Sequence, residues 1–517
     1  MLLAVVLGYV GLTLAVTDLH RYLAYDEAIY LSQVYPGPAL PFTAPRARGL
    51  PLLLVPLGWF DAPIPVIRGY LLTVEAGLMY LGFNAWLPVL RGRAVITAAV
   101  FGVGWLPLFY GTEVFPNLPV AFGVLAAAGY LARYLTGTSG RPALLGCAVA
   151  VALVASVRPT EAAFVTVGVC IVGVTRSRRE LALRWGLPVV GLVLGCLPWL
   201  IEGALRFGGP LSRIRAASSN VGGGFHPANL RQQLSFTDGP VAGSLRDRIP
   251  WPGTLWWLLI GVAVVVLVVR VLIGRADREQ RAGATAAVVG VATASPYLFL
   301  IRVQEARFLL PAYAVLAVAE VAAVPSPAGI RRSARRWAGL QAQPQVEGRA
   351  EPQTELPAVP QAEQAELPAG RRPGWLGSAL LVVALSVAVA AFAGWQISAA
   401  RRVQTDQVAA RKLAQTLVDV VRAQGPPPCV VAGEVAFPVI AFGARCRGAP
   451  FRPDSPDITV EVGSDRAAMP RVYVLTSTDP ARTGVNAVPG SVRPLAADGI
   501  PHWWLFIASP DEVVAAS

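Results

Sequence analysis

Charged residues, and lysine and histidine above all, are scarce in this chain of 517 residues. Lys412 is the only lysine, there are three histidines, and charged residues make up 15% of the chain against 54% hydrophobic ones. With a mean hydropathy of +0.53, the chain has too much apolar sequence and too few charges for a soluble domain of this length. The composition therefore predicts an integral membrane protein.

Metal and nucleotide motifs are also absent from the sequence. Three histidines and no Cys-x-x-Cys pair leave little for a metal site, so we expect no cofactor, and a divalent metal shared by Asp26 and Glu113 has only weak support. The glycines at 222–224 fit neither the GxGxxG nor the Walker pattern. Cys429 and Cys446 lie in polar sequence and can form a disulfide if that region is exported.

The net charge of +13 would suit a nucleic acid partner, because basic domains attract phosphates. Membrane topology explains it better, since arginine is enriched in short cytoplasmic loops. The excess of Arg over Lys, together with abundant Ala, Val, Gly and Pro, is typical of a GC-rich bacterial genome. We therefore expect a multi-pass protein of a bacterial plasma membrane, with the lipid bilayer and not nucleic acid as its partner.

Apolar runs that approach the roughly 20 residues needed to cross a bilayer recur along the chain. The first, at residues 1–18, lacks a basic segment and predicts an uncleaved helix, with a signal peptide as the alternative. Together the runs predict about eleven transmembrane helices. The others lie near residues 66–89, 94–111, 117–135, 142–157, 159–175, 186–201, 253–273, 283–301, 306–324 and 375–398.

Arginines in the short loops set the orientation, because they stay on the cytoplasmic side. They gather between alternate helices, which places the N-terminus inside. The loops then expected outside are 19–65, 112–116, 158–161, 202–252 and 302–306.

Four parts follow along the chain. Residues 1–324 form a transmembrane core, and residues 325–374, rich in Gln, Glu, Pro and Ala, form a disordered cytoplasmic linker. Residues 375–398 form the last transmembrane helix, and residues 400–517 form a small soluble domain outside the cytoplasm.

The last part has the pattern of an α/β domain. Apolar spacing predicts an amphipathic helix around residues 408–421, and short apolar runs predict strands at 429–431, 472–475 and 503–506. In the core, the run at 50–60 is too short to span and predicts an interfacial or re-entrant segment.

Charged side chains gather where the predicted helices reach the outer face. Ionisable groups near a membrane are costly, and they usually line a cavity or pair with one another. The cluster therefore predicts a functional site, although solvated loops and structural ion pairs would explain each member singly. Its members are Asp26, Glu27, Glu113, Arg158, Glu161, Glu305 and Arg307.

Asp26 and Glu27 follow the first helix in an apolar and aromatic setting with Tyr25 and Tyr30. A partly buried carboxylate there can have its pKa tuned for proton transfer. We predict catalytic roles for Asp26, Glu27 and Glu113, with Asp26 as the base.

Arginines beside these carboxylates suit a phosphate group, which a guanidinium binds through two charge-assisted hydrogen bonds. Arg46 and Arg48 lie in the same outer loop as Asp26, and Arg158, Glu305 and Arg307 lie at helix mouths. We predict substrate-binding roles for these five residues.

Four stretches, in this order, resemble the C-type glycosyltransferases (GT-C), the multi-helix membrane enzymes that take sugars from polyprenyl-phosphate donors. They are Tyr25-Asp26-Glu27, Glu113 with Asn117, Arg158-Pro159, and Glu305-Ala306-Arg307-Phe308-Leu309-Leu310-Pro311. The last is similar to an Arg-Phe/Tyr-x-x-Pro segment of mannosyltransferases, so mannose is favoured. The resemblance covers about residues 1–325 and implies a GT-C-like, α-helical polytopic fold with an extracytoplasmic active site.

The resemblance also implies an inverting transfer to an acceptor hydroxyl on a glycan, lipid or protein. Asp26 would then accept the hydroxyl proton, and Arg307 and Arg158 would lie near the leaving phosphate. The chain departs from protein mannosyltransferases, which often have a His-Pro pair where residues 44–49 read Ala-Pro-Arg-Ala-Arg-Gly. The subfamily and the acceptor therefore stay open.

Two other functions compete with this interpretation. A lipid or glycan transporter, such as a flippase, commonly shows internal repeats and polar residues at mid-membrane, whereas no repeat is visible here. A noncatalytic assembly or sensor protein would work through residues 400–517. The long loop at 203–252, with its glycines, suits an acceptor-binding lid or an ordinary flexible loop.

Overall fold

The computed structural model describes residues 1–241, 249–324, 375–433, 437–450, 472–476, 491–495 and 504–508. The predicted linker at 325–374 lies outside these residues. Contacts divide the chain into two units. One comprises Met1–Ala323 with Gln396–Ser517, and the other is Val324–Trp395.

Six helices among the described residues are long and apolar enough to cross a membrane. They are α4 (Ile64–Asn84), α8 (Asn117–Leu135), α11 (Arg178–Arg206), α14 (Trp251–Leu272), α15 (Arg278–Phe299) and the stretch Ala306–Ala323, formed by η1 (Ala306–Leu309) and α16 (Leu310–Ala323). The shorter apolar helices are α1 (Leu2–Val16), α3 (Gly49–Trp59), α6 (Gly92–Gly102), α9 (Arg141–Val157) and α10 (Pro159–Val172). The predicted polytopic helical fold is confirmed.

Shorter helices connect these elements. The apolar run predicted at 94–111 is divided after Gly102 into α6 and α7 (Trp105–Tyr110). The other short helices are α2 (Tyr25–Leu31), α5 (Leu87–Leu90), α12 (Pro210–Asn220) and α13 (Asn229–Ser235).

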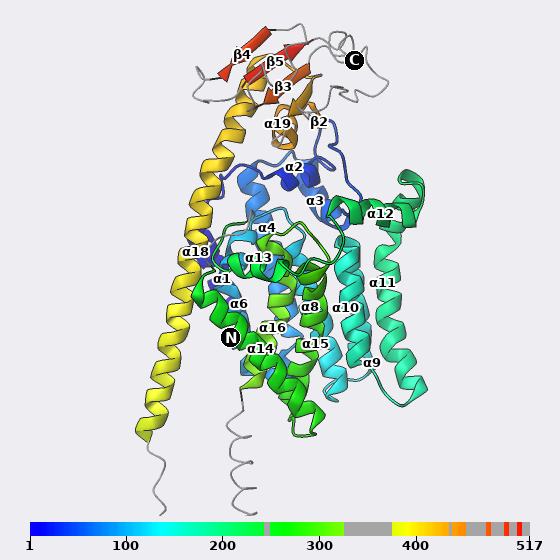
Figure 1. The fold of residues 1–517 in the computed structure, drawn as a ribbon, viewed down its shortest axis with the longest axis vertical. Coiled ribbons are helices and arrows are strands. Elements are labelled where there is room, and N and C mark those ends of the chain that lie inside the picture. Colours follow the sequence, from blue (N-terminus) through cyan, green and yellow to red (C-terminus); the bar gives the residue numbers. More distant parts are fainter. Residues whose placement is uncertain are drawn as a thin grey trace, which may run out of the picture. The chain divides into compact units, whose positions relative to one another are not determined.

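Small residues bring the membrane helices close together. Helix α9 contacts both α8 and α11, and α9, α10 and α11 lie side by side in Figure 1. Gly191 and Gly195 of α11 face the backbone carbonyls of Ala148 and Ala152 of α9, which a Cβ atom at either glycine would meet. This spacing of small residues is a common way for membrane helices to approach one another closely.

Helix α18 (Trp375–Ala423) is one continuous helix of 49 residues. The predicted last transmembrane helix and the predicted amphipathic helix are therefore two parts of the same element. From Gln396 onward, α18 turns a face with Ala399, Ala400 and Val403 into the helical core.

The described part of the chain after α18 contains a small mixed sheet with the order β2-β1-β3-β5-β4. Strand β1 is parallel to β2 and β3, whereas β5 is antiparallel to β3 and β4. The predicted α/β character is confirmed, and the predicted strands correspond to β1, β3 and β5. The elements are β1 (Val430–Gly433), α19 (Phe437–Ala444), β2 (Arg447–Pro450), β3 (Val472–Thr476), β4 (Ser491–Pro494) and β5 (Trp504–Ala508).

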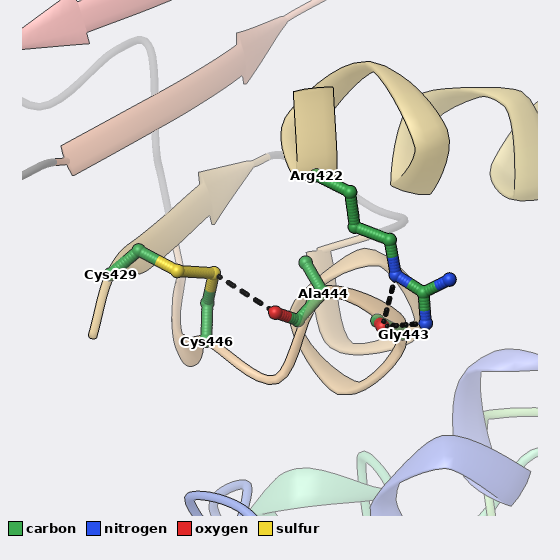
Figure 2. The surroundings of a disulfide bond; sticks show 5 residues. All are labelled: Arg422, Cys429, Gly443, Ala444 and Cys446. Carbon is green, nitrogen blue, oxygen red and sulfur yellow. Dashed lines mark hydrogen bonds between the residues drawn. A yellow bond between two sulfur atoms is a disulfide. The ribbon is translucent and has the colours of Figure 1, made fainter. Parts of the chain in front are cut away.

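Cys429, just before β1, and Cys446, just before β2, form a disulfide (Figure 2). Beside it, the Nε and Nη2 atoms of Arg422 at the end of α18 donate to the carbonyl oxygen of Gly443, at 3.0 and 2.6 Å. The disulfide and this contact fasten α19 to both β1 and α18.

Helix α19 packs against α2, which carries Asp26. The rings of Phe437 and Tyr25 meet edge to face with their centroids 6.2 Å apart. A Cβ atom at Gly443 would meet the hydroxyl of Tyr22, so the two segments approach closely there. The C-terminal domain therefore contacts the segment that bears the predicted base.

Candidate active site

The two adjacent carboxylates of α2 lie in different surroundings. Successive residues of a helix point about 100° apart, since there are about 3.6 residues per turn. The side chain of Asp26 is 24% exposed, whereas that of Glu27 is 0% exposed. The pair that the sequence presents together is therefore divided between two ion networks.

The partly exposed network consists of Asp26, Arg46, Glu305 and Arg307, which we call the Asp26 cluster. Arg46 Nη2 donates to Asp26 Oδ1, and Arg307 Nη2 donates to Asp26 Oδ2 at 2.7 Å. Arg307 Nη1 also lies 2.5 Å from Glu305 Oε2. The structure thus brings together four residues that the sequence predicts for the site, from three separate segments.

The charges of this cluster set its titration. Burial alone would raise the pKa of Asp26, but Arg307 and Arg46 outweigh burial and hold that pKa below its usual range. Burial raises the pKa of Glu305 despite the nearby Arg307. At neutral pH Asp26 is therefore ionised and able to accept a proton.

Arg158 lies next to this cluster, between α9 and α10. Its Nη1 atom is 2.6 Å from Glu161 Oε1 and 3.0 Å from the hydroxyl of Tyr297. The guanidinium carbons of Arg158 and Arg307 lie 5.7 and 5.6 Å from the centroid of the Phe308 ring. Two cations thus meet at one aromatic ring, close to Asp26.

Glu27 and Glu113 belong to a second network with Arg21, Arg68 and Arg411, which we call the buried cluster. Arg68 Nη2 donates to Glu27 Oε2 at 3.0 Å, and Arg411 Nη2 donates to Glu113 Oε2 at 2.9 Å. Arg68 and Arg21 also pair with Glu27 and Glu113, respectively. All five side chains are buried.

The buried cluster favours a structural role for its two carboxylates. The sequence places Glu113 at the outer face beside Asp26, but the structure buries it among arginines. Burial would raise the pKa of Glu27, and the guanidinium groups of Arg68 and Arg411 lower it to about 2. Both side chains are fully buried among these arginines, so their catalytic roles stay a prediction.

Arg48 also departs from the predicted grouping. Its described contacts are Glu202 Oε1 at 3.0 Å from Nε, Gln33 Oε1 at 2.8 Å from Nη1, and the ring of Phe42, 4.1 Å from its guanidinium carbon. Arg46, two residues earlier, reaches Asp26 instead.

Sequence reasoning missed several members of these networks. Arg68 had a usable signal, because it lies within an apolar run where a charge needs a partner. Arg411 gives no such signal, because it lies in a predicted amphipathic helix in which arginines are expected to face solvent. Arg21 is likewise an ordinary loop residue in the sequence, and so is Glu202, the partner of Arg48.

No group of three or more His, Cys, Asp or Glu side chains that could hold a metal ion occurs among the residues the structure describes. Asp26 and Glu113, the two carboxylates considered for a shared metal, lie in different ion networks.

Solved structures of other proteins share the fold of this chain. No protein-family model and no curated protein sequence matches the chain. Two crystal structures of ArnT from Cupriavidus metallidurans are similar over 98% of this chain. The structure bound to undecaprenyl phosphate has 15% identity, 97% of its own length covered and a TM-score of 0.57. The apo structure has 13% identity, 98% covered and a TM-score of 0.59.

The oligosaccharyltransferase of Archaeoglobus fulgidus, tethered with an acceptor peptide, is similar over 94% of this chain and 70% of its own. Its identity is 12% and its TM-score is 0.50. These identities are low, so the likeness concerns the arrangement of the chain. The protein has the GT-C-like fold that the four motif stretches predict, shared with ArnT over nearly its full length.

Proposed function

We propose that the protein is an integral membrane glycosyltransferase that moves a sugar from a polyprenyl-phosphate donor to an acceptor hydroxyl. The observation that carries this proposal is the Asp26 carboxylate, which is partly exposed and paired with Arg46 and Arg307. Support for the donor class comes from the ArnT structure bound to undecaprenyl phosphate, because that chain has the same fold.

In the proposed reaction, Asp26 accepts the proton of the acceptor hydroxyl while the hydroxyl oxygen attacks the anomeric carbon of the donor. The bond between that carbon and the phosphate oxygen breaks, the configuration inverts, and polyprenyl phosphate leaves with the bonding electrons. Arg307, Arg158 and Arg46 stabilise the negative charge that develops on the phosphate, as preorganised donors do.

The ion pairs of Asp26 imply that the donor binds before the acceptor. In the free protein, Arg46 and Arg307 lower the pKa of Asp26, which also makes it a weak base. A donor phosphate competes for the same guanidinium groups, so its binding weakens their hold on Asp26 and raises the basicity of the carboxylate. We propose that donor binding thus prepares Asp26 for the acceptor.

The finer assignments rest on the sequence. We propose mannose as the favoured sugar, because the segment from Glu305 to Pro311 resembles that of mannosyltransferases. We also propose an active site on the outer face of a bacterial plasma membrane, from the arginines of the short loops. The acceptor is a hydroxyl of a glycan, a lipid or a protein.

The first test is sugar transfer in membranes that contain the protein, with labelled polyprenyl-phosphate mannose and polyprenyl-phosphate glucose assayed in parallel. Asp26→Asn should lower transfer by about 10²- to 10⁴-fold, the usual contribution of a general base. Asp61→Asn is the matched control, because Asp61 lies in the same outer loop and pairs with Arg445 at the surface.

Two outcomes would count against the proposal. Transfer unchanged by Asp26→Asn would remove Asp26 from the role of base. No transfer from either donor, together with movement of the lipid across the bilayer, would favour a transporter.

A further inference from the structure

A fully buried arginine lies in the long loop at 202–252. Arg213 is on α12, and its side chain is 0% exposed. A buried guanidinium is costly unless its N–H groups are paired. Its partners therefore show what it holds in place.

The guanidinium of Arg213 donates to three backbone carbonyl oxygens. Nε donates to Ala44 at 3.1 Å, Nη1 to Trp199 at 2.7 Å, and Nη2 to Arg46 at 2.9 Å. Nη2 also lies 3.0 Å from Glu202 Oε2, which supplies the opposite charge. Aromatic rings complete the site, with the Arg213 guanidinium carbon 4.5 Å from the centroid of Trp199.

The segment that Arg213 contacts is the irregular loop before α3, which ends at Arg48. Irregular backbone takes its shape from side-chain hydrogen bonds because it lacks a regular ladder of its own. Trp199 Nε1 is a second donor to the Ala44 carbonyl, at 3.1 Å. Arg48 Nε reaches Glu202 Oε1 at 3.0 Å. The C-terminal end of α11 and helix α12 together hold this loop on both sides of Arg46.

Arg46 extends from this held loop to Asp26. Its carbonyl is bound by Arg213, while its Nη2 donates to Asp26 Oδ1. We propose that Arg213 is a positioning residue that fixes the loop so that Arg46 reaches Asp26 and the donor phosphate. The proposal rests on the function proposed above, and Arg213 acts through Arg46 without touching the substrate.

The pKa of Asp26 reports on this arrangement. The charged and titratable groups around Asp26 are Arg46, Arg307, Arg158, Glu305, Tyr25 and Tyr30. Of these, Arg213 binds only Arg46. Displacing Arg46 removes a positive charge from the carboxylate, so the pKa of Asp26 should rise. The acid limb of a pH profile that depends on ionised Asp26 then moves to higher pH.

The test compares Arg213→Met, Arg46→Gln and the double variant in the purified full chain. We expect Arg213→Met to lower kcat/KM by about 10- to 100-fold, as a misplaced binding group does. Its acid limb should move to higher pH, as in Arg46→Gln. Because both changes act on one interaction, the double variant should lose little more than Arg46→Gln alone.

Arg206→Gln is the matched control. Arg206 lies 3.6 Å from the same Glu202 carboxylate and its side chain is 66% exposed, so its replacement leaves the contacts of Arg48 and Arg213 with Glu202 in place. It should keep the activity and acid limb of the wild type. If Arg213→Met does not fold, Trp199→Phe removes the indole donor to Ala44, keeps an aromatic ring beside Arg213, and should shift the limb in the same direction.

A readout without turnover separates this inference from the proposed function. The carboxyl stretch of Asp26, found by infrared difference against Asp26→Asn, gives its pKa in the wild type and in Arg213→Met. A raised pKa in the variant supports the positioning role even if the wild type transfers no sugar from the donors tested. An unchanged pKa, or losses in the double variant that multiply, would overturn it.

Discussion

At the scale of single residues, the site depends on how each charge is paired. Arg46 and Arg48 are two residues apart, yet the first contacts Asp26 and the second contacts Glu202 and Gln33. We propose that Arg46, beside the proposed base, is the guanidinium that a donor phosphate reaches, because the described contacts of Arg48 are with Glu202 and Gln33, outside the Asp26 cluster.

These pairings predict unequal effects of two similar substitutions. Arg46→Gln should lower transfer by about 10²-fold or more, the cost of losing one preorganised donor. Arg48→Gln should lower it less, because the described contacts of Arg48 are with Glu202 and Gln33 and not with the Asp26 cluster. Initial rates at saturating and at limiting donor would measure both. Equal losses would show that the loop as a whole, and not Arg46, carries the effect.

The sequence predicts these residues only in part. It groups Asp26, Arg46, Glu305 and Arg307 at the outer face, because the arginines in the short loops between alternate helices set the orientation of the chain. It cannot separate Asp26 from Glu27, since that depends on which partner each side chain meets. The partners of Glu27 are distant in sequence. The position of Arg68 within an apolar run predicts a buried charge, but it does not show which residue pairs with it.

At the scale of elements, close helix packing depends on glycines. Gly195 of α11 faces the Ala152 carbonyl of α9, whereas Gly186 of the same helix has no atom within 4 Å of a Cβ placed there. Gly195→Ala should therefore push α9 and α11 apart and lower stability by about 1–3 kcal/mol, as overpacking does. Gly186→Ala should be neutral or stabilising by up to about 1 kcal/mol, from helix propensity.

Thermal unfolding in detergent would compare the two glycine variants at equal protein concentration. A midpoint lowered by Gly195→Ala and kept by Gly186→Ala is the expected result. A midpoint kept by Gly195→Ala would mean that helix packing at Gly195 is loose, and one lowered equally by both variants would mean that the close contact at Gly195 is not the cause of the loss.

The predicted elements are largely correct because apolar runs determine where helices form. The two changes of element have local causes. Gly104 precedes α7 and divides a run that hydropathy alone joins. Conversely, the fall in hydropathy near residue 399 suggests a helix end, but nothing in that stretch breaks the backbone pattern and α18 continues to Ala423.

At the scale of the whole molecule, the last part of the chain contacts the loop that follows α1. Arg411 of α18 donates to Glu113 and contacts Glu27, and α19 packs against α2. The segment that carries Asp26 is therefore held by residues almost 400 positions later in the sequence. We expect the C-terminal domain to stabilise the site rather than to act as a separate module.

Arg411→Gln tests this link. It removes a donor from Glu113 and should lower stability by about 1–3 kcal/mol, the cost of a buried polar group left unpaired. Arg401→Gln, at an exposed position of the same helix, is the control and should change little. Thermal unfolding of both variants in detergent measures the difference. Equal midpoints would mean that Arg411 of α18 does not stabilise the segment that carries Asp26.

The central claim is that Asp26 acts on the acceptor and not in holding the donor. The most direct measurement is made on purified protein, with donor binding and sugar transfer followed for the wild type and Asp26→Asn side by side. We predict that the variant binds the polyprenyl-phosphate donor at least as tightly, because a negative charge near the phosphate is removed, while transfer falls by about 10²- to 10⁴-fold. A variant that transfers at the wild-type rate, or that no longer binds the donor, would contradict it.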